Sequence, residues 1–567
     1  MQKVLTAEQM REVDRLTTER YGIPSIILME NAAHAVARVI TEKLGGSVKG
    51  KSILILCGKG NNGGDGAALA RILAIQGAYV DILLFGKIAE TKGDARINFG
   101  VLCREDFEFD DVYMSNFGEL REIGSKEEWV RFYMQSGQFT DVIVDALFGT
   151  GVTRPLDIWL GNVVHDLNFV NDVEDPPKPR LCVSVDLPSG LNANLGSPIG
   201  ESVHADVTVT FTAPKPGNIL PDVAAFNGEL VIADIGSPDK LIDAQFSQLY
   251  LAEKIDSEYW LEETKFSDNS YKNKRGHALM IAGSESYSGA AVLCGNVAMR
   301  SGVGLVTIAT PKSSKDSVAS RVLPEVMVKG VAETASGSIN EAAFDELNDL
   351  LGKADSVAIG SGISQDESTK KFVQKVIETR RQPTIVDADA LNLLSPFDEQ
   401  MQKPAREQGR NTQADNSDAS EMLAIQSPLI LTPHEGEFMR LLGTTDKDSI
   451  NDRVAAVREF SQKHNVILVL KGERVLIGEP GGKVVVNPTG NSGLGKAGNG
   501  DTLTGILAGF VAQAVAMKID IFETVIAAVY IAGMAGDIAE KNYGKRVMTA
   551  SDVRECLTEV FGELVGN

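Results

Sequence analysis

Cysteine is scarce in this sequence of 567 residues, and it forms no pattern. The five cysteines are scattered, odd in number and without a CxxC pair. A disulfide framework and a metal–thiolate site are therefore not expected, and the thiols are interpreted as reduced. Long apolar runs are also missing, because charge or glycine interrupts them, and the N-terminus lacks an apolar segment of signal-peptide length. We expect a cytoplasmic protein without a membrane span.

Positive charge is in deficit. Lys and Arg number 55 against 77 Asp and Glu, which gives a formal net charge of −22. This balance disfavours binding to nucleic acid or to an anionic membrane, although backbone amides can still hold a small anionic ligand. Apolar residues make up 43% and charged residues 23%, as in ordinary folded chains. The length predicts two or more domains.

Glycine is abundant, and its 55 residues gather where strand-like runs end and helix-like runs begin. Short strands alternating with helices predict an α/β fold with parallel sheets, in which ligands bind beyond the carboxyl ends of the strands. In the first half, strand-like runs at 52–57, 141–147, 181–186 and 206–211 are followed by the loops GKGNNGGDG, FGTGVTRPL, LPSG and TAPKPG.

The α/β pattern restarts after residue 250, which predicts one domain over residues 1–250 and a second over 251–567. No internal repeat is visible, so the chain is interpreted as a fusion rather than a duplication. Thr6 and Gln9 have the spacing of a capping box, which predicts a helix starting there. Residues 104–128, 171–180 and 396–426 are polar and are expected to form surface excursions. Strands of the second half are expected at 277–282, 304–309, 355–359, 383–387, 428–432, 466–470, 474–477 and 483–486.

Two acids and a glycine loop carry the candidate chemistry of the first half. The loop 58–66 leads into a helical pattern from Ala67, and its backbone could approach a phosphate. It is neither a P-loop nor a GxGxxG turn. Asp145 and Asp186 close predicted strands, where a carboxylate is a candidate acid/base group or cation ligand. The structural alternative is an aspartate that accepts backbone hydrogen bonds in a turn.

In the second half, Gly498-Asn499-Gly500-Asp501 precedes an apolar helix. Free amides at a helix start form an anion hole, and Asp501 in the first turn could accept a proton from an attacking hydroxyl. A structural N-cap aspartate is the alternative. The segment 471–475, KGERV, lies between two predicted strands, as the loop at the edge of a nucleotide site could.

The motifs GKGNNGGDG, VDALFGTGVTRPL, SVDLPSGLNANLG and TVTFTAPKPG, in this order, resemble the NAD(P)H-hydrate epimerase domain over residues 1–235. The resemblance implies a Rossmann-like three-layer α/β/α sandwich that interconverts the R and S epimers of the hydrates NADHX and NADPHX. It implies a potassium ion on Asn62, Asp145 and Ser189, oxygen ligands that suit a hard cation. Hydrate contacts are implied for Asn61, Asn62, Gly63, Gly64, Asp65, Gly149, Thr150, Gly151, Val152, Thr153, Arg154, Pro155 and Asp186. Asp186 is our candidate for the carboxylate that moves the proton, with Asp145 as the alternative.

The second half resembles the ADP- or ATP-dependent NAD(P)H-hydrate dehydratase over residues 255–565, through GHALMIAGSESYSGAAVLC, DSVAIGSGIS, TIVDADALNLL, LTPHEGEF, LVLKGERVLIG and TGNSGLGKAGNGDTLTGILAGF. Its GNGD resembles the GAGD of ribokinase-like enzymes, which implies a ribokinase-like α/β fold. With the first half, the whole chain resembles the bifunctional NAD(P)H-hydrate repair enzymes. The family's usual GPGLG reads Gly360-Ser361-Gly362-Ile363-Ser364 here. The resemblance implies hydrate contacts at Ala290, Gly362, His434 and Asp501, and nucleotide contacts at Lys471, Gly472, Glu473, Arg474, Val475 and Gly500.

The implied dehydration consumes ADP or ATP with magnesium, and the sequence does not distinguish the two nucleotides. Asp501 would take the proton from the hydrate hydroxyl as it attacks the terminal phosphate, and the ring nitrogen would then expel phosphate. A homo-oligomer is expected, with small molecules as its other partners. Two alternatives stay open: a small-molecule kinase with an appended binding domain, and a first half that is an inert scaffold, as in RNA-decapping enhancers.

Overall fold

The computed structural model describes residues 1–103, 117–135, 140–171, 181–398 and 427–565. The chain folds as two compact units, one over Gln2–Ser247 and one that begins at Gln248 and includes Met1. Most of the expected excursions at 171–180 and 396–426 lies outside the described residues; of the described part, Asn171 ends the helix Ile158–Asn171. The five cysteines are unpaired, and only Cys103 is exposed.

The first unit is built on a parallel sheet of order β4-β3-β2-β5-β6-β7-β8. The expected strands β2, β5, β6 and β7 are confirmed to within a residue or two. Its strands are β2 (Ser52–Cys57), β3 (Tyr79–Phe85), β4 (Phe117–Ile123), β5 (Val142–Ala146), β6 (Leu181–Val185), β7 (Val207–Phe211) and β8 (Glu229–Ala233).

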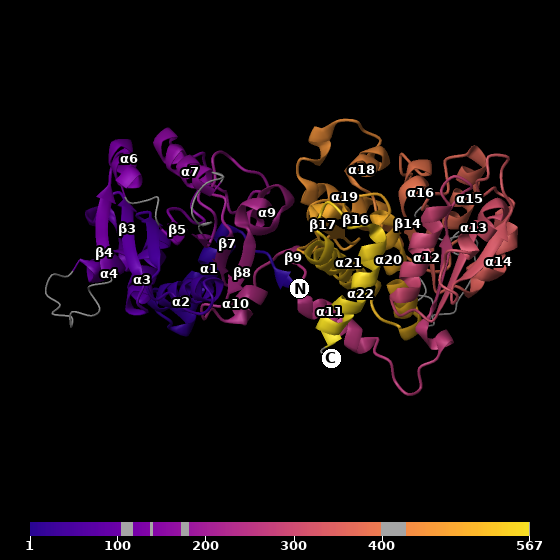
Figure 1. The fold of residues 1–567 in the computed structure, drawn as a ribbon, viewed down its shortest axis with the longest axis horizontal. Helices are drawn as coiled ribbons and strands as arrows, with labels where there is room; N and C mark the ends of the chain where they lie inside the picture. Colours follow the sequence, from indigo (N-terminus) through magenta and orange to yellow (C-terminus); the bar gives the residue numbers. More distant parts are fainter. Residues whose placement is uncertain (104–116, 136–139, 172–180, 399–426, 566–567) are drawn as a thin grey trace, which may run out of the picture. The chain divides into compact units, whose positions relative to one another are not determined.

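Helices cover both faces of this sheet (Figure 1), which makes three layers. Helices α2 (Ser25–Lys43) and α3 (Asn61–Ile75) share one apolar cluster with the sheet, while α6 (Lys126–Gln135) and α7 (Ile158–Asn171) share the other. The remaining helices are α1 (Ala7–Tyr21), α4 (Gly93–Leu102), α8 (Pro216–Ile219), α9 (Pro221–Asn227) and α10 (Asp239–Asp243). The predicted capping box is present at α1: Gln9 N donates to Thr6 Oγ1 and Thr6 N donates to Gln9 Oε1.

The prediction of a surface excursion over 104–128 is wrong in its described part. Phe117–Ile123 forms the edge strand β4, and Lys126 begins α6. An edge strand has one side open to water, so it tolerates the polar residues that made the segment resemble a loop. Asp81 of β3 supports the edge by accepting a hydrogen bond from Glu119 N at 3.0 Å.

The second unit is built on a longer sheet, which runs β9-β18-β17-β16-β15-β14-β13-β10-β11-β12. The strands from β16 to β12 are parallel, whereas β16, β17 and β18 are antiparallel. The expected strands are all present, but β9 and β12 were not predicted. The strands are β9 (Leu249–Leu251), β10 (His277–Ile281), β11 (Leu305–Pro311), β12 (Met327–Val331), β13 (Ser356–Ile359), β14 (Thr384–Val386), β15 (Leu429–Leu431), β16 (Ile467–Leu470), β17 (Val475–Gly478) and β18 (Val484–Asn487).

Helices α12, α20, α21 and α22 share one apolar cluster with this sheet, while α14 and α19 pack on strands from the other side (Figure 1). The helices are α11 (Lys254–Glu263), α12 (Ser288–Arg300), α13 (Lys315–Ala319), α14 (Ala343–Lys353), α15 (Glu367–Glu378), α16 (Ala388–Leu393), α18 (Glu435–Leu442), α19 (Arg453–His464), α20 (Asn499–Met517), α21 (Ile521–Tyr543) and α22 (Ala550–Val565).

Two of these helices, α20 and α21, are longer and more continuously apolar than the sequence analysis expected. By length and composition either could cross a membrane, but 67% and 72% of their apolar windows are buried inside the fold. Their residues form the centre of the second unit's core. Burial of this kind is typical of core helices in large α/β domains.

Candidate functional site

The glycine-rich segment of the first unit is mostly helical. Helix α3 begins at Asn61, six residues before the predicted start, with Gly60 as its N-cap. The glycines allow close packing: a Cβ on Gly63 would lie 1.7 Å from Gly58 O, and one on Gly64 would lie 2.8 Å from Ala95 Cα. The free amides of the first turn therefore open at the carboxyl end of β2, where an anion can bind.

Asp186 follows β6 directly and forms a buried ion pair with Lys215. Lys215 Nζ lies 2.6 Å from Asp186 Oδ1, and its side chain is only 2% exposed. Thr210 Oγ1 also donates to this carboxylate, and Asn218 Nδ2 donates to the Asp186 carbonyl. Asp186 has a φ of 66°, in the left-handed region. A carboxylate held so firmly in an uncommon backbone conformation is typical of a functional site.

Two of the three residues predicted to hold a cation, Asp145 and Ser189, contact each other. Asp145 is fully buried and accepts hydrogen bonds from Ser189 N, Ser189 Oγ and Ser184 Oγ. Burial raises the pKa of Asp145, although these hydrogen bonds oppose the shift. Among the described residues no cation pairs with it. Asn62 Nδ2 is buried without a hydrogen-bond partner, as expected of a group that meets a ligand.

The loop after β5 brings Gly149 to the middle of this cluster. A Cβ on Gly149 would lie 3.3 Å from Asn62 Oδ1 and 3.4 Å from Asp186 Oδ2. Glycine thus leaves open the space that both side chains face. The rest of the predicted segment, from Thr150 to Pro155, is largely exposed apart from Val152.

Two further carboxylates, Asp65 and Asp14, interact electrostatically with the Asp186–Lys215 region. Burial raises the pKa of Asp65 well above its ordinary value, with added repulsion from Asp186 and Asp14. Burial also raises the pKa of Asp14 to about 6, which Lys215 opposes and Asp186 reinforces. Burial and mutual repulsion therefore favour the protonated forms of Asp65 and Asp14.

In the second unit, Gly498 rather than Asp501 is the N-cap of α20. Gly498 has a φ of 92°, and Asp501 is the third residue of the helix. The alternative of a structural N-cap aspartate is therefore wrong. Burial raises the pKa of Asp501 to about 6; Ser361 and Lys471 oppose the shift, and Asp387 and Asp389 add to it. Such a pKa suits a general base near neutral pH.

Lys471 lies beside this helix start and pairs with Asp387, a residue that follows β14. Lys471 Nζ is 2.8 Å from Asp387 Oδ1 and 3.9 Å from Glu437 Oε2. Burial would lower the pKa of Lys471, but Asp387 and Glu437 raise it overall, so the amine stays charged. A Cβ on Gly500 would lie 3.6 Å from both Lys471 Nζ and Asp387 Oδ2. Cation and helix amides thus converge on one point.

Of the residues predicted to line the hydrate site of the second unit, Gly362 lies close to Ala290, and His434 lies beside Lys471. A Cβ on Gly362, which has a φ of 65°, would lie 2.9 Å from Ala290 Cβ. His434 Nδ1 accepts hydrogen bonds from Gly436 N and Glu437 N, so its ring caps α18 while more than half of it stays exposed. An isolated β-bridge pairs the backbone of His434 with that of Lys471.

The loop between β16 and β17 is largely exposed, as expected of a loop at the edge of a nucleotide site. Gly472 and Glu473 are exposed, while burial lowers the pKa of Arg474, which donates to the Pro488 carbonyl. A Cβ on Gly472 would lie 3.3 Å from Arg453 Nη1. Arg453, which forms an ion pair with Glu435, therefore also lies at this loop, and the sequence did not reveal it.

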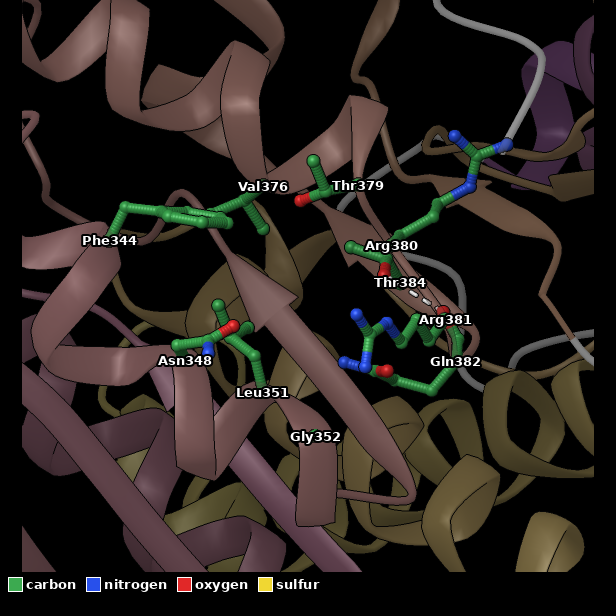
Figure 2. A pocket seen from close by; sticks show the side chains of 10 residues that line it. All are labelled: Phe344, Asn348, Leu351, Gly352, Val376, Thr379, Arg380, Arg381, Gln382 and Thr384. Atoms are coloured by element: carbon green, nitrogen blue, oxygen red, sulfur yellow. Dashed lines mark hydrogen bonds between the residues drawn. The ribbon is translucent and has the colours of Figure 1, made fainter. Parts of the chain in front are cut away.

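A separate cavity of about 170 Å³ lies near the amino end of β14, between α14 and α15 (Figure 2). Arg380 contributes to its lining, but its guanidinium donates to the Ser427 and Ile377 carbonyls. Thr384 begins β14 on this side, whereas Asp387 follows the strand on the other. The cavity therefore does not belong to the site around Asp501.

Both units thus place acids, lysines and free helix amides at the carboxyl ends of parallel strands, the arrangement of nucleotide-handling α/β enzymes. Residues 278–559 match the family described as NAD(P)H-hydrate dehydratase, and residues 25–217 match the family described as YjeF-related protein N-terminus.

Relatives match over nearly the whole chain. The bifunctional NAD(P)H-hydrate repair enzyme of Moorella thermoacetica is 34% identical over 99% of this chain and 97% of its own length. That of Thermofilum pendens is 32% identical over the same shares. A Bacillus subtilis ADP/ATP-dependent NAD(P)H-hydrate dehydratase, co-crystallised with ATP/Mg²⁺, is 28% identical and covers 56% of this chain and 98% of its own, with a TM-score of 0.44.

The chain belongs to the family of bifunctional NAD(P)H-hydrate repair enzymes. The family resemblance predicted from the motifs is confirmed. The predicted α/β fold class is confirmed as well: a Rossmann-like parallel sheet in the first unit, and in the second a largely parallel sheet within the residues that match the NAD(P)H-hydrate dehydratase family.

Proposed function

We propose that this chain repairs hydrated nicotinamide nucleotides: its first unit interconverts R- and S-NAD(P)H hydrate, and its second unit dehydrates the S epimer with ADP or ATP. The observation that carries the proposal is that each unit places one candidate acid/base carboxylate, Asp186 or Asp501, at a strand-end site with free helix amides. The family of the chain supports both activities.

In the first unit, the reacting carbon carries a hydroxyl next to the ring nitrogen. Epimerisation requires this carbon to become planar and then to be attacked again from the other face. Asp186 is assigned to the proton transfer, because Gly149 leaves open the space that its Oδ2 faces. Lys215 holds the other carboxylate oxygen and fixes its orientation. The amides of Asn61 and Asn62 at the start of α3 are assigned to the nucleotide's phosphates.

Potassium fits the residues that we assign to it in the first unit. Asn62, Asp145 and Ser189 offer amide, carboxylate and hydroxyl oxygens, which suit a hard monovalent cation. A buried carboxylate that no described cation pairs with gains from such an ion. When bound, potassium would supply a positive charge that pairs with the buried Asp145 carboxylate. The chain itself orients these ligands through the hydrogen bonds from Ser184 and Ser189 to Asp145.

In the second unit, Asp501 accepts the proton of the hydrate hydroxyl while the hydroxyl oxygen attacks the terminal phosphorus of the nucleotide. A phosphate ester forms as the bond to the departing nucleotide breaks. The ring nitrogen's electron pair then expels phosphate, and loss of a neighbouring proton restores the dihydropyridine. The amides of Gly500 and Asp501, together with Lys471 Nζ, would stabilise the phosphoryl charge.

Magnesium enters as part of the co-substrate, held by the nucleotide's phosphate oxygens and water. Among the described residues no group of three His, Cys, Asp or Glu side chains could hold a metal ion. Ala290, Gly362 and His434 are assigned to the hydrate, and residues 471–475 to the adenine nucleotide.

We further propose a cytoplasmic homo-oligomer that binds neither nucleic acid nor membrane, in line with its charge of −22.

The test is incubation of the protein with S-NADHX, magnesium and either ADP or ATP, with the absorbance of reduced nicotinamide and the release of phosphate followed together. We expect both to rise in equal amounts. A small-molecule kinase would instead leave a stable phosphorylated product without reduced nicotinamide. An inert first half would fail to interconvert the two epimers in the absence of nucleotide.

A further inference from the structure

Asp387 takes part in none of the steps above, yet it is among the most completely buried acids of the second unit. Its side chain is 2% exposed, although it follows β14 at the end of the sheet where ligands bind. Burial would raise its pKa, but Lys471 and two threonines lower it overall, so the carboxylate is charged. A buried charge is retained only where it is paired and hydrogen-bonded.

The partners of Asp387 come from three other elements. Lys471 Nζ, after β16, donates to Oδ1 at 2.8 Å. Thr432 Oγ1, after β15, donates to the same oxygen at 2.8 Å. Thr504 Oγ1, in the second turn of α20, donates to Oδ2 at 2.9 Å. One carboxylate therefore ties the nucleotide loop to the helix that carries Asp501.

We propose that Asp387 is a positioning residue for dehydration: it aims the Lys471 ammonium at the amide hole of α20 and, through its negative charge, keeps Asp501 basic enough to accept a proton. The inference rests on the proposed function of the second unit. Asp387 meets Gly500 closely enough to act on that hole, since a Cβ there would lie 3.6 Å from its Oδ2. Oδ1 accepts two hydrogen bonds and Oδ2 accepts one, so both carboxylate oxygens are engaged by the protein itself.

The charges around Asp501 give the sign of the effect. Asp387 and Asp389 raise the pKa of Asp501, and Lys471 lowers it. Asp501 in turn raises the pKa of the buried Cys294 thiol on α12. Removing the negative charge at 387 should therefore lower the pKa of Asp501, whereas removing the positive charge at 471 should raise it. A role limited to packing would move neither.

The experiment compares Asp387→Asn and Lys471→Met with the parent protein. Asparagine keeps the size and an acceptor for Lys471 but removes the charge. The titration of Asp501 is followed in the ligand-free protein by carboxyl ¹³C NMR, assigned with Asp501→Asn, and the acid limb of the pH–rate profile is followed with S-NADHX. Nearby charges typically shift a pKa by about one unit. We expect a shift of about that size to lower pH for Asp387→Asn and to higher pH for Lys471→Met.

Asp355→Asn is the matched control, because Asp355 precedes β13 at the opposite end of the sheet and accepts a hydrogen bond from His277 N. It should leave both titrations unchanged. If Asp387→Asn does not fold, the test uses Lys471→Met together with Thr504→Val, a variant that keeps both charges. Thr504→Val should lower turnover without shifting the acid limb of the pH–rate profile. Shifts in the same direction, or none, would overturn the proposal. Absent turnover in the parent would overturn the proposed function instead, while the NMR titration still decides the role of Asp387.

Discussion

Lys215 Nζ lies 2.6 Å from Asp186 Oδ1, in a pair whose lysine is almost fully buried. The remaining oxygen, Oδ2, faces the space above Gly149. One oxygen is thus fixed by the protein and the other is left for a ligand. This division is what a proton-transferring carboxylate needs.

Asp186→Asn should lower epimerisation by about 100- to 10,000-fold, the usual contribution of a general acid–base group. The amide keeps the shape but cannot accept the proton. Epimer interconversion is measured by chromatography without nucleotide, and dehydration of pure S-NADHX should be unchanged. Asp206→Asn is the control, because Asp206 accepts a hydrogen bond from Cys182 N at the opposite end of the sheet. An undiminished rate in Asp186→Asn would transfer the role to Asp145.

Asp501→Asn should abolish dehydration and leave nucleotide binding nearly intact. Gly498 is the helix cap, so the substitution does not disturb the start of α20. Turnover should fall at least about 100-fold, the lower end for a lost general base. Calorimetric titration of ADP on the same preparation should show an affinity changed only a few-fold. Loss of both turnover and ADP binding would contradict the assignment.

Dehydration should depend on pH through Asp501. The base must be ionised, and its pKa is raised to about 6. The rate at saturating nucleotide should therefore fall about tenfold per pH unit below 6 and level off above 7. The epimerase rate, measured in the same buffers, provides the comparison. A profile that is flat from pH 5 to pH 8 would remove Asp501 from the proton transfer.

Asp14→Asn should stabilise the first unit, and increasingly so at higher pH. The pKa of Asp14 is about 6 in the folded chain against an ordinary 3.8, so its stabilising protonated form is lost as pH rises through 6. The gain should approach about 3 kcal/mol above pH 7 and vanish below pH 4. Thermal unfolding followed by tryptophan fluorescence measures it. Glu12→Gln on the same helix, where Arg15 lowers the carboxyl pKa, should show no gain.

Much of this architecture was predictable from the sequence, because buried parallel strands appear as apolar runs and glycine clusters mark their carboxyl ends. The motifs also located Asp186, Asp501 and Lys471. The start of α3 was misplaced, since glycines that permit close packing in a helix resemble those of a loop. The edge strand β4 was missed because its polar residues face water.

Lys215 and Asp387 escaped the sequence analysis for a different reason. Both stand inside quoted motifs, TAPKPG and TIVDADALNLL, but each matters through a partner that is distant in the chain, Asp186 or Lys471. Spacing alone does not reveal such pairs. A charged residue within an otherwise apolar strand-end motif is the signal that could have found them.

The central claim is that one chain carries both activities, and pure R-NADHX tests it most directly. With ATP or ADP and magnesium, the parent protein should restore all of the R epimer to NADH, because epimerisation feeds dehydration. Asp186→Asn should restore S-NADHX at the parent rate but R-NADHX only at the slow spontaneous rate of epimerisation. If the parent protein leaves R-NADHX untouched, or if Asp186→Asn converts it as fast as the parent, the account is contradicted.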